Sequence, residues 1–194
     1  MFMHLLKLLK ENIRLARLQS RMAKHFPSFT EQKKWLDKIK TIDKNILSAH
    51  NQSHILSFLI EILEMPDSVN GCIVEAGAFK GASTAKISLF AAYKNRKLHV
   101  FDSFEGLPNN IEQHEKSTEG HSIKGWFKQG NFSGSLEEVQ DNIEKFGDPS
   151  VVCFHKGWFE DTLPHFKEKI ALIYLDVDLA SSTKTCLINL YPLL

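Results

Sequence analysis

The chain has 194 residues, which suits one domain with an appendage. Hydrophobic residues make up 43% and charged residues 24%, a composition typical of soluble globular domains. The net charge is +1, so the strongly basic character that general nucleic-acid binding requires is excluded.

Three cysteines, Cys72, Cys153 and Cys186, lack the spacing of a metal site, and two of them lie in apolar runs. Buried, reduced thiols are typical of cytosolic proteins, so we expect a cytoplasmic location. No apolar stretch is long enough to span a membrane. The N-terminal segment is a poor secretory signal, because Lys7 and Lys10 interrupt its apolar part.

Residues 2–24 are predicted to form an amphipathic helix. Apolar residues recur at helical spacing, and basic residues form one stripe: Lys7, Lys10, Arg14, Arg17, Arg21 and Lys24. Such a helix can lie on an acidic membrane surface. We favour the simpler interpretation, a helix packed on its own domain or on a partner subunit, and we expect a homo-oligomer.

A polar stretch follows, and then a second predicted helix near residues 52–64, which Pro66 ends. We divide the chain into a helical extension, residues 1–50, and a main domain, residues 51–194. In the main domain, strands are predicted at 72–75, 98–102, 151–154 and 170–175, and helices at 83–92, 136–146 and 181–190. Ser135 is expected to cap the helix of residues 136–146, and Gly147 to end it.

This alternation predicts a doubly wound α/β fold with a mostly parallel sheet. Ligands of such sheets bind beyond the carboxyl ends of the strands. Polar residues stand at the ends of all the predicted strands: Glu75, Asp102, His155 and Asp176. One edge of the sheet is therefore the first candidate for a functional site.

A glycine-bearing turn, residues 75–83, joins the first strand to the next helix. Glycines let the backbone approach a ligand closely, and the free N–H groups of the helix start face an anion. Phe79 and Lys80 occupy the turn where a dinucleotide motif needs small residues, and no P-loop lysine follows. A carboxylate fits this turn better than a phosphate does; a tight turn without a ligand is the plain alternative.

Three further acidic residues indicate a functional site. Asp102 lies 27 residues after Glu75 and can bind both ribose hydroxyls of an adenosine cofactor, or simply cap a turn. Asp176 and Asp178 follow an apolar strand and can hold a hard divalent cation, because side chains two apart in an extended segment share a face. The alternative is that one of these two acids caps the following helix.

Four blocks carry a resemblance to a known family: EAGAFKGAS (75–83), FDSFEGLP (101–108), KGWFEDTLP (156–164) and DVDL (176–179). They resemble the signature blocks of the macrocin/mycinamicin O-methyltransferases, which are class I S-adenosylmethionine-dependent enzymes. The resemblance covers about residues 50–194, and the second and third blocks are long and specific.

The resemblance implies a Rossmann-like methyltransferase fold, S-adenosylmethionine, Mg²⁺ and a deoxysugar hydroxyl as acceptor. It implies a cofactor site made of Glu75, Gly77, Gly81 and Ser83 at the methionine end, Asp102 and Ser103 at the ribose, and Gly157, Trp158 and Phe159 near the adenine. Asp176 would be the first metal ligand, as in the similar catechol O-methyltransferases, with Asp178 beside it.

The chemistry agrees with that assignment. A metal that binds two adjacent oxygens lowers the pKa of a sugar hydroxyl, and a histidine can remove the proton. The methyl group then transfers in line, so positioning supplies much of the rate. Candidates for the base are His114, His121 and His155, of which we prefer His121.

Two departures from the family matter. Ala180 stands where the family has a tyrosine, and the sequence stops at Leu194, before the family's fifth strand and the Asp-Asp pair that completes the metal site. We therefore expect an exposed apolar edge on the strand that ends at Asp176, too few metal ligands, and weak or no activity of this chain alone.

Two other functions fit parts of the sequence. Asp-x-Asp after an apolar strand also suits a glycosyltransferase that holds a nucleotide sugar through a metal, but such an enzyme does not need the turn of residues 75–83. A degenerate methyltransferase that serves as a non-catalytic binding module, or as a membrane-surface module through residues 2–24, is the other alternative. Ala180 and the missing metal ligands favour this second alternative, the degenerate methyltransferase.

Overall fold

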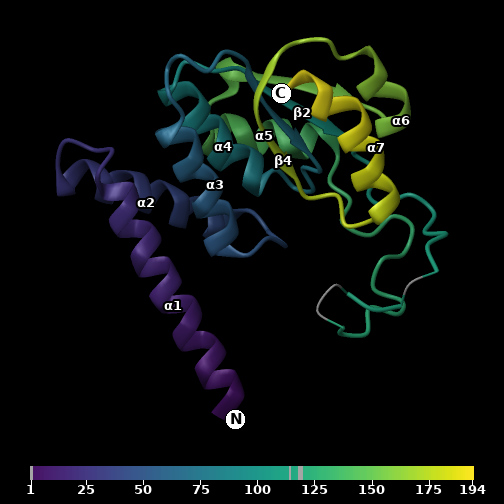
Figure 1. The fold of residues 1–194 in the computed structure, drawn as a ribbon, viewed down its shortest axis with the longest axis horizontal. Coiled ribbons are helices and arrows are strands. Elements are labelled where there is room, and N and C mark those ends of the chain that lie inside the picture. The colour runs from purple at the N-terminus through teal and green to yellow at the C-terminus, as the bar shows by residue number, and fades with distance from the viewer. Residues whose placement is uncertain (1, 114, 118–119) are drawn as a thin grey trace.

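A computed structural model describes residues 2–113, 115–117 and 120–194, and its centre is a four-stranded parallel sheet with helices on both faces (Figure 1). The strands are β1 (Cys72–Ala76), β2 (Leu98–Asp102), β3 (Val152–Lys156) and β4 (Ile170–Leu175), in the order β3-β2-β1-β4. The predicted α/β fold with a parallel sheet is confirmed, and each strand lies within two residues of its predicted range.

The register of the sheet brings the predicted site residues together. Ala76 of β1 pairs with Phe101 of β2 on one side and with Leu175 of β4 on the other. Because the strands run parallel, the residues at or just after their ends, Gly77, Asp102 and Asp176, emerge at one edge.

Helices cover the two faces of the sheet and form two apolar cores. One face packs against α3 (Gln52–Glu64), α4 (Ala82–Tyr93) and α5 (Leu136–Phe146), and the other against α6 (Phe159–Thr162) and α7 (Ala180–Leu190). All five residues of β1 are buried, as expected for a central parallel strand. Short 3₁₀ helices lie at Pro149–Val151, Leu163–His165 and Tyr191–Leu193.

The predicted helices of the main domain are confirmed, with one omission. The Ser135 hydroxyl accepts a hydrogen bond from the Glu138 N–H at 3.1 Å, and Gly147 follows the last residue of α5, as expected. The helix α6 has four residues, too few to show helical periodicity, and was not predicted.

The extension contains two helices, α1 (Phe2–Ala23) and α2 (Phe29–Asn45), and α1 projects away from the sheet toward the N-terminus (Figure 1). The last turns of α1 pack on α3, where Arg21 forms ion pairs with Glu61 and Glu64. Packing of this helix on its own domain, the favoured interpretation, thus holds for its C-terminal half. The described residues contain no helix long and apolar enough to span a membrane.

The sequence analysis missed α2. Its first turn is capped by the Ser28 hydroxyl, which accepts from the Glu31 N–H at 3.2 Å. Trp35, Ile39 and Ile42 follow at spacings of four and three, which is a helical pattern. In sequence the segment is mostly polar, and its lysines lie on the exposed face of the helix.

An aromatic cluster fastens α2 to the main domain. The Trp35 ring lies 4.8 Å from Phe90 of α4, 5.4 Å from Tyr93 and 5.6 Å from Phe26, measured between ring centroids. Phe90 is fully buried, so the cluster reaches the core, whereas Tyr93 at its edge is 47% exposed.

We predict that Trp35→Ala lowers the free energy of unfolding by about 2 kcal/mol, less than for a fully buried tryptophan because Trp35 is half-buried. Urea denaturation measures the change. Phe29→Ala is the matched control, since this aromatic residue of the same helix is 78% exposed and its loss is expected to cost under about 0.5 kcal/mol. Equal losses in the two variants would contradict the proposed role of the cluster.

Candidate functional site

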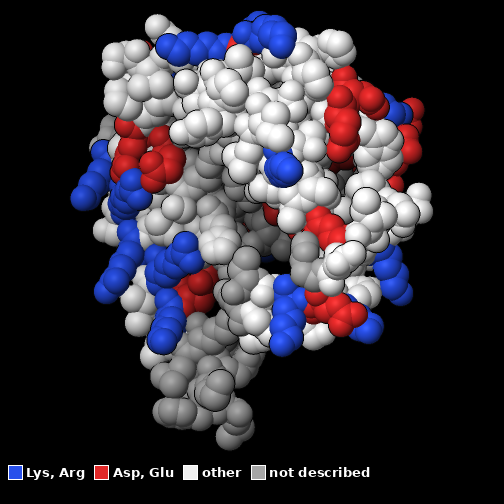
Figure 2. Space-filling model, turned by 45° about the vertical axis from the view of Figure 1, so that its right-hand side comes forward, with Lys and Arg blue, Asp and Glu red and all other residues white. Residues whose placement is uncertain are grey.

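A cavity of about 670 Å³ opens at the edge of the sheet where the strands end. The surface is visibly hollowed on the face that Figure 2 displays. The walls come from the turn after β1, the start of α4, the end of β2, and the loops that follow β3 and β4. The lining is completed by residues 47–50, 106–108 and 126–127, by Phe132, and by Ser181 and Ser182 of α7.

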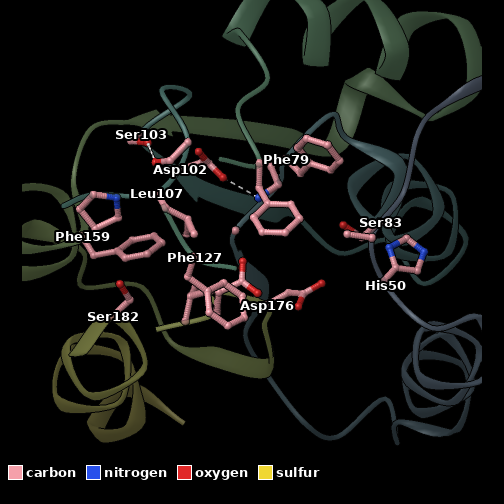
Figure 3. Close-up of a pocket in the computed structure, with 18 of the residues that line it drawn as sticks. His50, Phe79, Ser83, Asp102, Ser103, Leu107, Phe127, Phe159, Asp176 and Ser182 are labelled. Carbon is pink, nitrogen blue, oxygen red and sulfur yellow. Dashed lines mark hydrogen bonds between the residues drawn. The ribbon is translucent and has the colours of Figure 1, made fainter. Parts of the chain in front are cut away.

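Most of the predicted site residues line this cavity: Gly77, Ser83, Asp102, Ser103, Gly157, Trp158, Phe159, Asp176 and Asp178. Figure 3 shows Ser83 and His50 at one end, Ser103 and Phe159 at the other, and Asp176 between them. Three predicted residues, Glu75, Gly81 and His121, are not among the lining residues. The sequence blocks thus converge on one space although they lie up to a hundred residues apart.

The turn after β1 requires glycine at its first position. Gly77 has a φ of +90°, and a Cβ there would lie 2.2 Å from the Asp176 carbonyl oxygen. Gly81, with a φ of +83°, precedes the first residue of α4 and packs toward Val139 of α5, so it shapes the helix start from behind the cavity.

Asp102 holds the two halves of the cavity wall together. Its carboxylate accepts hydrogen bonds from the Ala78 N–H at 2.6 Å and from the Phe104 N–H at 2.7 Å. Burial raises the pKa of this carboxyl, and the backbone donors oppose that rise. The capping interpretation from the sequence is therefore correct, and it is compatible with ligand binding because the side chain also lines the cavity.

Glu75 lies beneath the floor of the cavity. It is fully buried, and neither carboxylate oxygen has a hydrogen-bond partner within the described part of the chain, although the Ser83 and Thr84 hydroxyls are close enough to favour its charge. Burial raises the pKa of Glu75 to about 8, and Asp176 and Asp102 add to the rise. An unpaired buried carboxyl costs folding free energy, so its presence points to a functional constraint.

Asp176 and Asp178 face the same cavity, but not by the expected geometry. Asp178 has a φ of +58°, so the segment leaves the extended conformation and the argument from an extended strand is wrong. Burial raises the pKa of Asp176, and burial together with the Asp176 charge raises the pKa of Asp178 to about 6. Two acids that oppose each other's ionisation in this way are a suitable start for a cation site.

The donor set of this acidic pair is only partial for a metal. Among the described residues, the one group of three side chains close enough to share an ion is Cys72, His99 and Glu168, which does not include either aspartate. Cys72 begins β1, so that group lies near the opposite end of the sheet. Asp176 and Asp178 fit Mg²⁺ as two ligands that need further oxygens.

The three candidate bases lie apart from the cavity or outside the described residues. His121 is exposed, in the long loop between β2 and α5. His155 accepts from or donates to His99 at 2.9 Å and stacks on Phe101, with ring centroids 4.2 Å apart. His114 lies outside the described residues.

The same loop nonetheless reaches the cavity. Trp126 and Phe127 line it, and the Glu112 carboxylate accepts a hydrogen bond from the Ser181 N–H of α7 at 2.6 Å. The sequence analysis did not identify these residues, nor the segment of residues 47–50. Aromatic residues in a polar loop were the available signal for the first group; nothing in the polar stretch marked the second.

Comparison with known proteins gives the family. A family model described as Macrocin-O-methyltransferase (TylF) matches residues 48–194. A relative from Streptomyces olivaceus, 8-demethyl-8-(2,3-dimethoxy-alpha-L-rhamnosyl)-tetracenomycin-C 4'-O-methyltransferase, is 34% identical over 146 residues, 71% of this chain and 53% of the relative. Demethyldecarbamoylnovobiocin O-methyltransferase from Streptomyces niveus is 30% identical over 131 residues, 65% of this chain and 49% of the relative.

Solved structures agree with this result. The structure of the O-methyltransferase NovP aligns at 27% identity with a TM-score of 0.55, over 72% of this chain and 58% of NovP. CalS11, described as a calicheamicin methyltransferase, aligns at 18% identity with a TM-score of 0.56, over 89% of this chain and 77% of CalS11. This likeness supports the fold alone. The chain spans about half the length of the curated relatives that it matches. On the family match over residues 48–194, the chain belongs to the macrocin O-methyltransferase family.

Proposed function

We propose that the cavity binds S-adenosylmethionine. The observation that carries this proposal is the convergence of the turn after β1, the end of β2 and the loop after β3 on one space of about 670 Å³. Ser83, in the first turn of α4, suits the methionine carboxylate, because a helix start attracts an anion. Asp102 suits the ribose hydroxyls, and Phe159 offers an apolar surface to the adenine.

We further propose that the protein methylates a hydroxyl of a sugar attached to a small molecule. The Streptomyces olivaceus relative is named for 4'-O-methylation of a compound that carries a rhamnosyl group. The acceptor would lie beside Asp176, which Figure 3 places between the two ends of the cavity, and beside Asp178, which also lines it. A deoxysugar acceptor, a homo-oligomer and a cytoplasmic location remain predictions from the sequence.

Each residue near the acceptor has a proposed task. Asp176 and Asp178 would hold Mg²⁺, which supplies Lewis-acid polarisation of the acceptor hydroxyl when bound. Trp126 and Phe127 line the cavity and would offer apolar surface to the acceptor. For His121 to accept the proton, the loop between β2 and α5 has to carry it toward the cavity, because its side chain is exposed and outside the lining.

Calorimetric titration with S-adenosylhomocysteine, with and without Mg²⁺, tests the cofactor proposal. We expect micromolar binding by the wild-type protein and at least about tenfold weaker binding by Asp102→Ala, which loses both ligand contacts and the hydrogen bonds to Ala78 and Phe104. Asp102→Asn keeps an acceptor oxygen and should bind with intermediate affinity.

Asp141→Ala is the control, because this exposed acid of α5 lies outside the cavity. Circular dichroism separates lost binding from lost structure in each variant. Wild-type affinity in Asp102→Ala would refute the proposed ribose site. A folded wild-type protein that binds no S-adenosylhomocysteine would limit the methyltransferase assignment to ancestry.

One observation favours a second candidate, the non-catalytic binding module. Asp176 and Asp178 are the carboxylates of the segment directly after β4 that line the cavity, and an alanine follows at position 180. Binding of S-adenosylhomocysteine without methyl transfer to any glycosylated acceptor, at saturating Mg²⁺, would support this candidate over the enzyme.

A further inference from the structure

A buried ion pair links the helical extension to the cavity. The Lys86 side chain of α4 is fully buried, and its ammonium lies 2.5 Å from a carboxylate oxygen of Asp43 in α2. The same ammonium lies 2.8 Å from Nε2 of His50. His50 in turn lines the cavity beside Ser83 (Figure 3). A buried lysine is expensive unless it is paired, so Asp43 and His50 together account for its presence.

The contact with Lys86 determines how His50 can act. An ammonium group has donors only, so the His50 Nε2 atom must accept the hydrogen bond. The ring proton of neutral His50 then lies on Nδ1. Burial and the Lys86 charge lower the pKa of His50 to about 4, which keeps the ring neutral at physiological pH. In the described part of the chain Nδ1 has no hydrogen-bond partner, so a donor is left for a ligand.

The neighbours of His50 identify the ligand group that this donor would meet. Ala82 and Ser83 belong to the first turn of α4 and line the same end of the cavity. The N-terminus of a helix favours a negative group, and Nδ1–H of His50 is a further donor at the same end of the cavity. Asp102 and Phe159, which suit ribose and adenine, lie toward the other end (Figure 3). A carboxylate of the ligand is therefore the hydrogen-bond acceptor that suits the His50 end of the cavity.

We propose that His50 donates its Nδ1–H to the carboxylate of the amino-acid part of the cofactor, and that Lys86 and Asp43 position it for this contact. The inference rests on the proposed function, because it assumes that the cavity binds S-adenosylmethionine. It makes the extension part of the cofactor site: α2 supplies Asp43, and the segment after α2 supplies His50.

Two ligands distinguish contacts to the amino-acid end of the cofactor from contacts to the rest of it. S-adenosylhomocysteine has the carboxylate, whereas 5′-methylthioadenosine has the same adenosine and sulfur but no amino-acid part. Calorimetry measures the affinity of each ligand for the wild-type protein and for His50→Gln, whose amide can keep the Lys86 contact but places no donor at the Nδ1 position. We expect about tenfold weaker binding of S-adenosylhomocysteine and a change under about twofold for 5′-methylthioadenosine.

Companion variants distinguish the contact from a structural effect. His50→Asn, whose amide nitrogen takes the place of Nδ1, should restore most of the affinity, and Lys86→Met should lose as much as His50→Gln. His165→Ala is the control, since this histidine is exposed and outside the cavity. The inference is wrong if His50→Gln binds S-adenosylhomocysteine like the wild type, or if both ligands weaken equally. A wild-type protein that binds neither ligand refutes the proposed function itself, whatever the variants do.

Discussion

Replacing Glu75 with glutamine is expected to make the protein more stable at pH 8 and to weaken cofactor binding. Glu75 is fully buried, without hydrogen-bond partners in the described structure, and burial raises its pKa from 4.5 to about 8. The amide of glutamine has nearly the same shape but no charge, so it removes the cost of ionising a carboxyl in the core.

The sign of the pH dependence follows from this raised pKa. Below pH 4.5 the carboxyl is protonated in the folded and the unfolded chain, so the wild-type and the variant should differ little. Between pH 4.5 and about 8 only the unfolded chain is ionised, and folding takes up a proton. Wild-type stability therefore falls with rising pH, and the advantage of Glu75→Gln grows to at most about 5 kcal/mol above pH 8.

Urea denaturation at a series of pH values from 5 to about 8.5 measures the difference in stability between the wild type and the variant. Most of this range lies between the pKa of Glu75 in the unfolded chain and its pKa in the folded chain. Glu144→Gln is the matched control, because Glu144 is an exposed glutamate of α5. A constant difference between Glu75→Gln and the wild type across the series would contradict the raised pKa. Weaker binding of S-adenosylhomocysteine by the more stable variant would show that Glu75 is retained for function, in the usual trade between stability and activity.

The sheet and the edge that carries the site followed from the sequence because both depend on short-range patterns. Apolar runs such as residues 170–175 indicate parallel strands, and the acids that end them must emerge at a common edge. The register aligns the ends of β1, β2 and β4, since Ala76 pairs with both Phe101 and Leu175. A cavity lined by Gly77, Asp102 and Asp176 is a consequence of this register.

The residues that sequence analysis missed depend on contacts between distant segments. His50 has no local motif; its importance arises because Lys86, 36 residues later, meets it inside the core. Asp43 lies in the polar stretch whose helix was not predicted, and its partner is again Lys86. Buried charges become visible only when the packing is known, because sequence alone shows lysines and aspartates that are usually exposed.

Local geometry also limited the assignments at the acidic pair and the base. The expectation of a shared face for Asp176 and Asp178 assumed an extended chain, and the positive φ of Asp178 contradicts that assumption. His121 was chosen from several histidines without knowledge of the loop that carries it. In the structure His121 is exposed and is not among the residues that line the cavity.

Gly77→Ala is expected to destabilise the protein by about 4 kcal/mol or more and to abolish binding of S-adenosylhomocysteine. Two costs combine at this position. Gly77 has a φ of +90°, which L-residues rarely adopt, and an added Cβ would lie 2.2 Å from the Asp176 carbonyl oxygen. That neighbour is backbone at the end of β4, so the clash can be relieved only by separating the ends of β1 and β4.

Two other glycines separate these costs. Gly130→Ala meets a φ of +78° but nothing within 4 Å of the new Cβ, so a loss of about 1 kcal/mol is expected. Gly134→Ala has no left-handed φ, but its Cβ would lie 2.2 Å from the Phe79 carbonyl oxygen. Urea denaturation of the three variants should give a much lower free energy of unfolding for Gly77→Ala than for Gly130→Ala. Equal stability of these two would mean that β1 and β4 do not approach as closely as described.

The same close approach explains why the cofactor turn and the acidic pair belong to one site. Gly77 begins the turn that faces the methionine end, and Asp176 begins the segment that would hold the cation. Because the Asp176 carbonyl fills the space where a side chain would project from position 77, the two backbones lie in direct contact. A shift of β4 that disturbs the acids must therefore also move the turn. We accordingly expect Gly77→Ala to weaken Mg²⁺ binding together with cofactor binding, whereas Asp102→Ala, at the end of β2, should affect the cofactor alone.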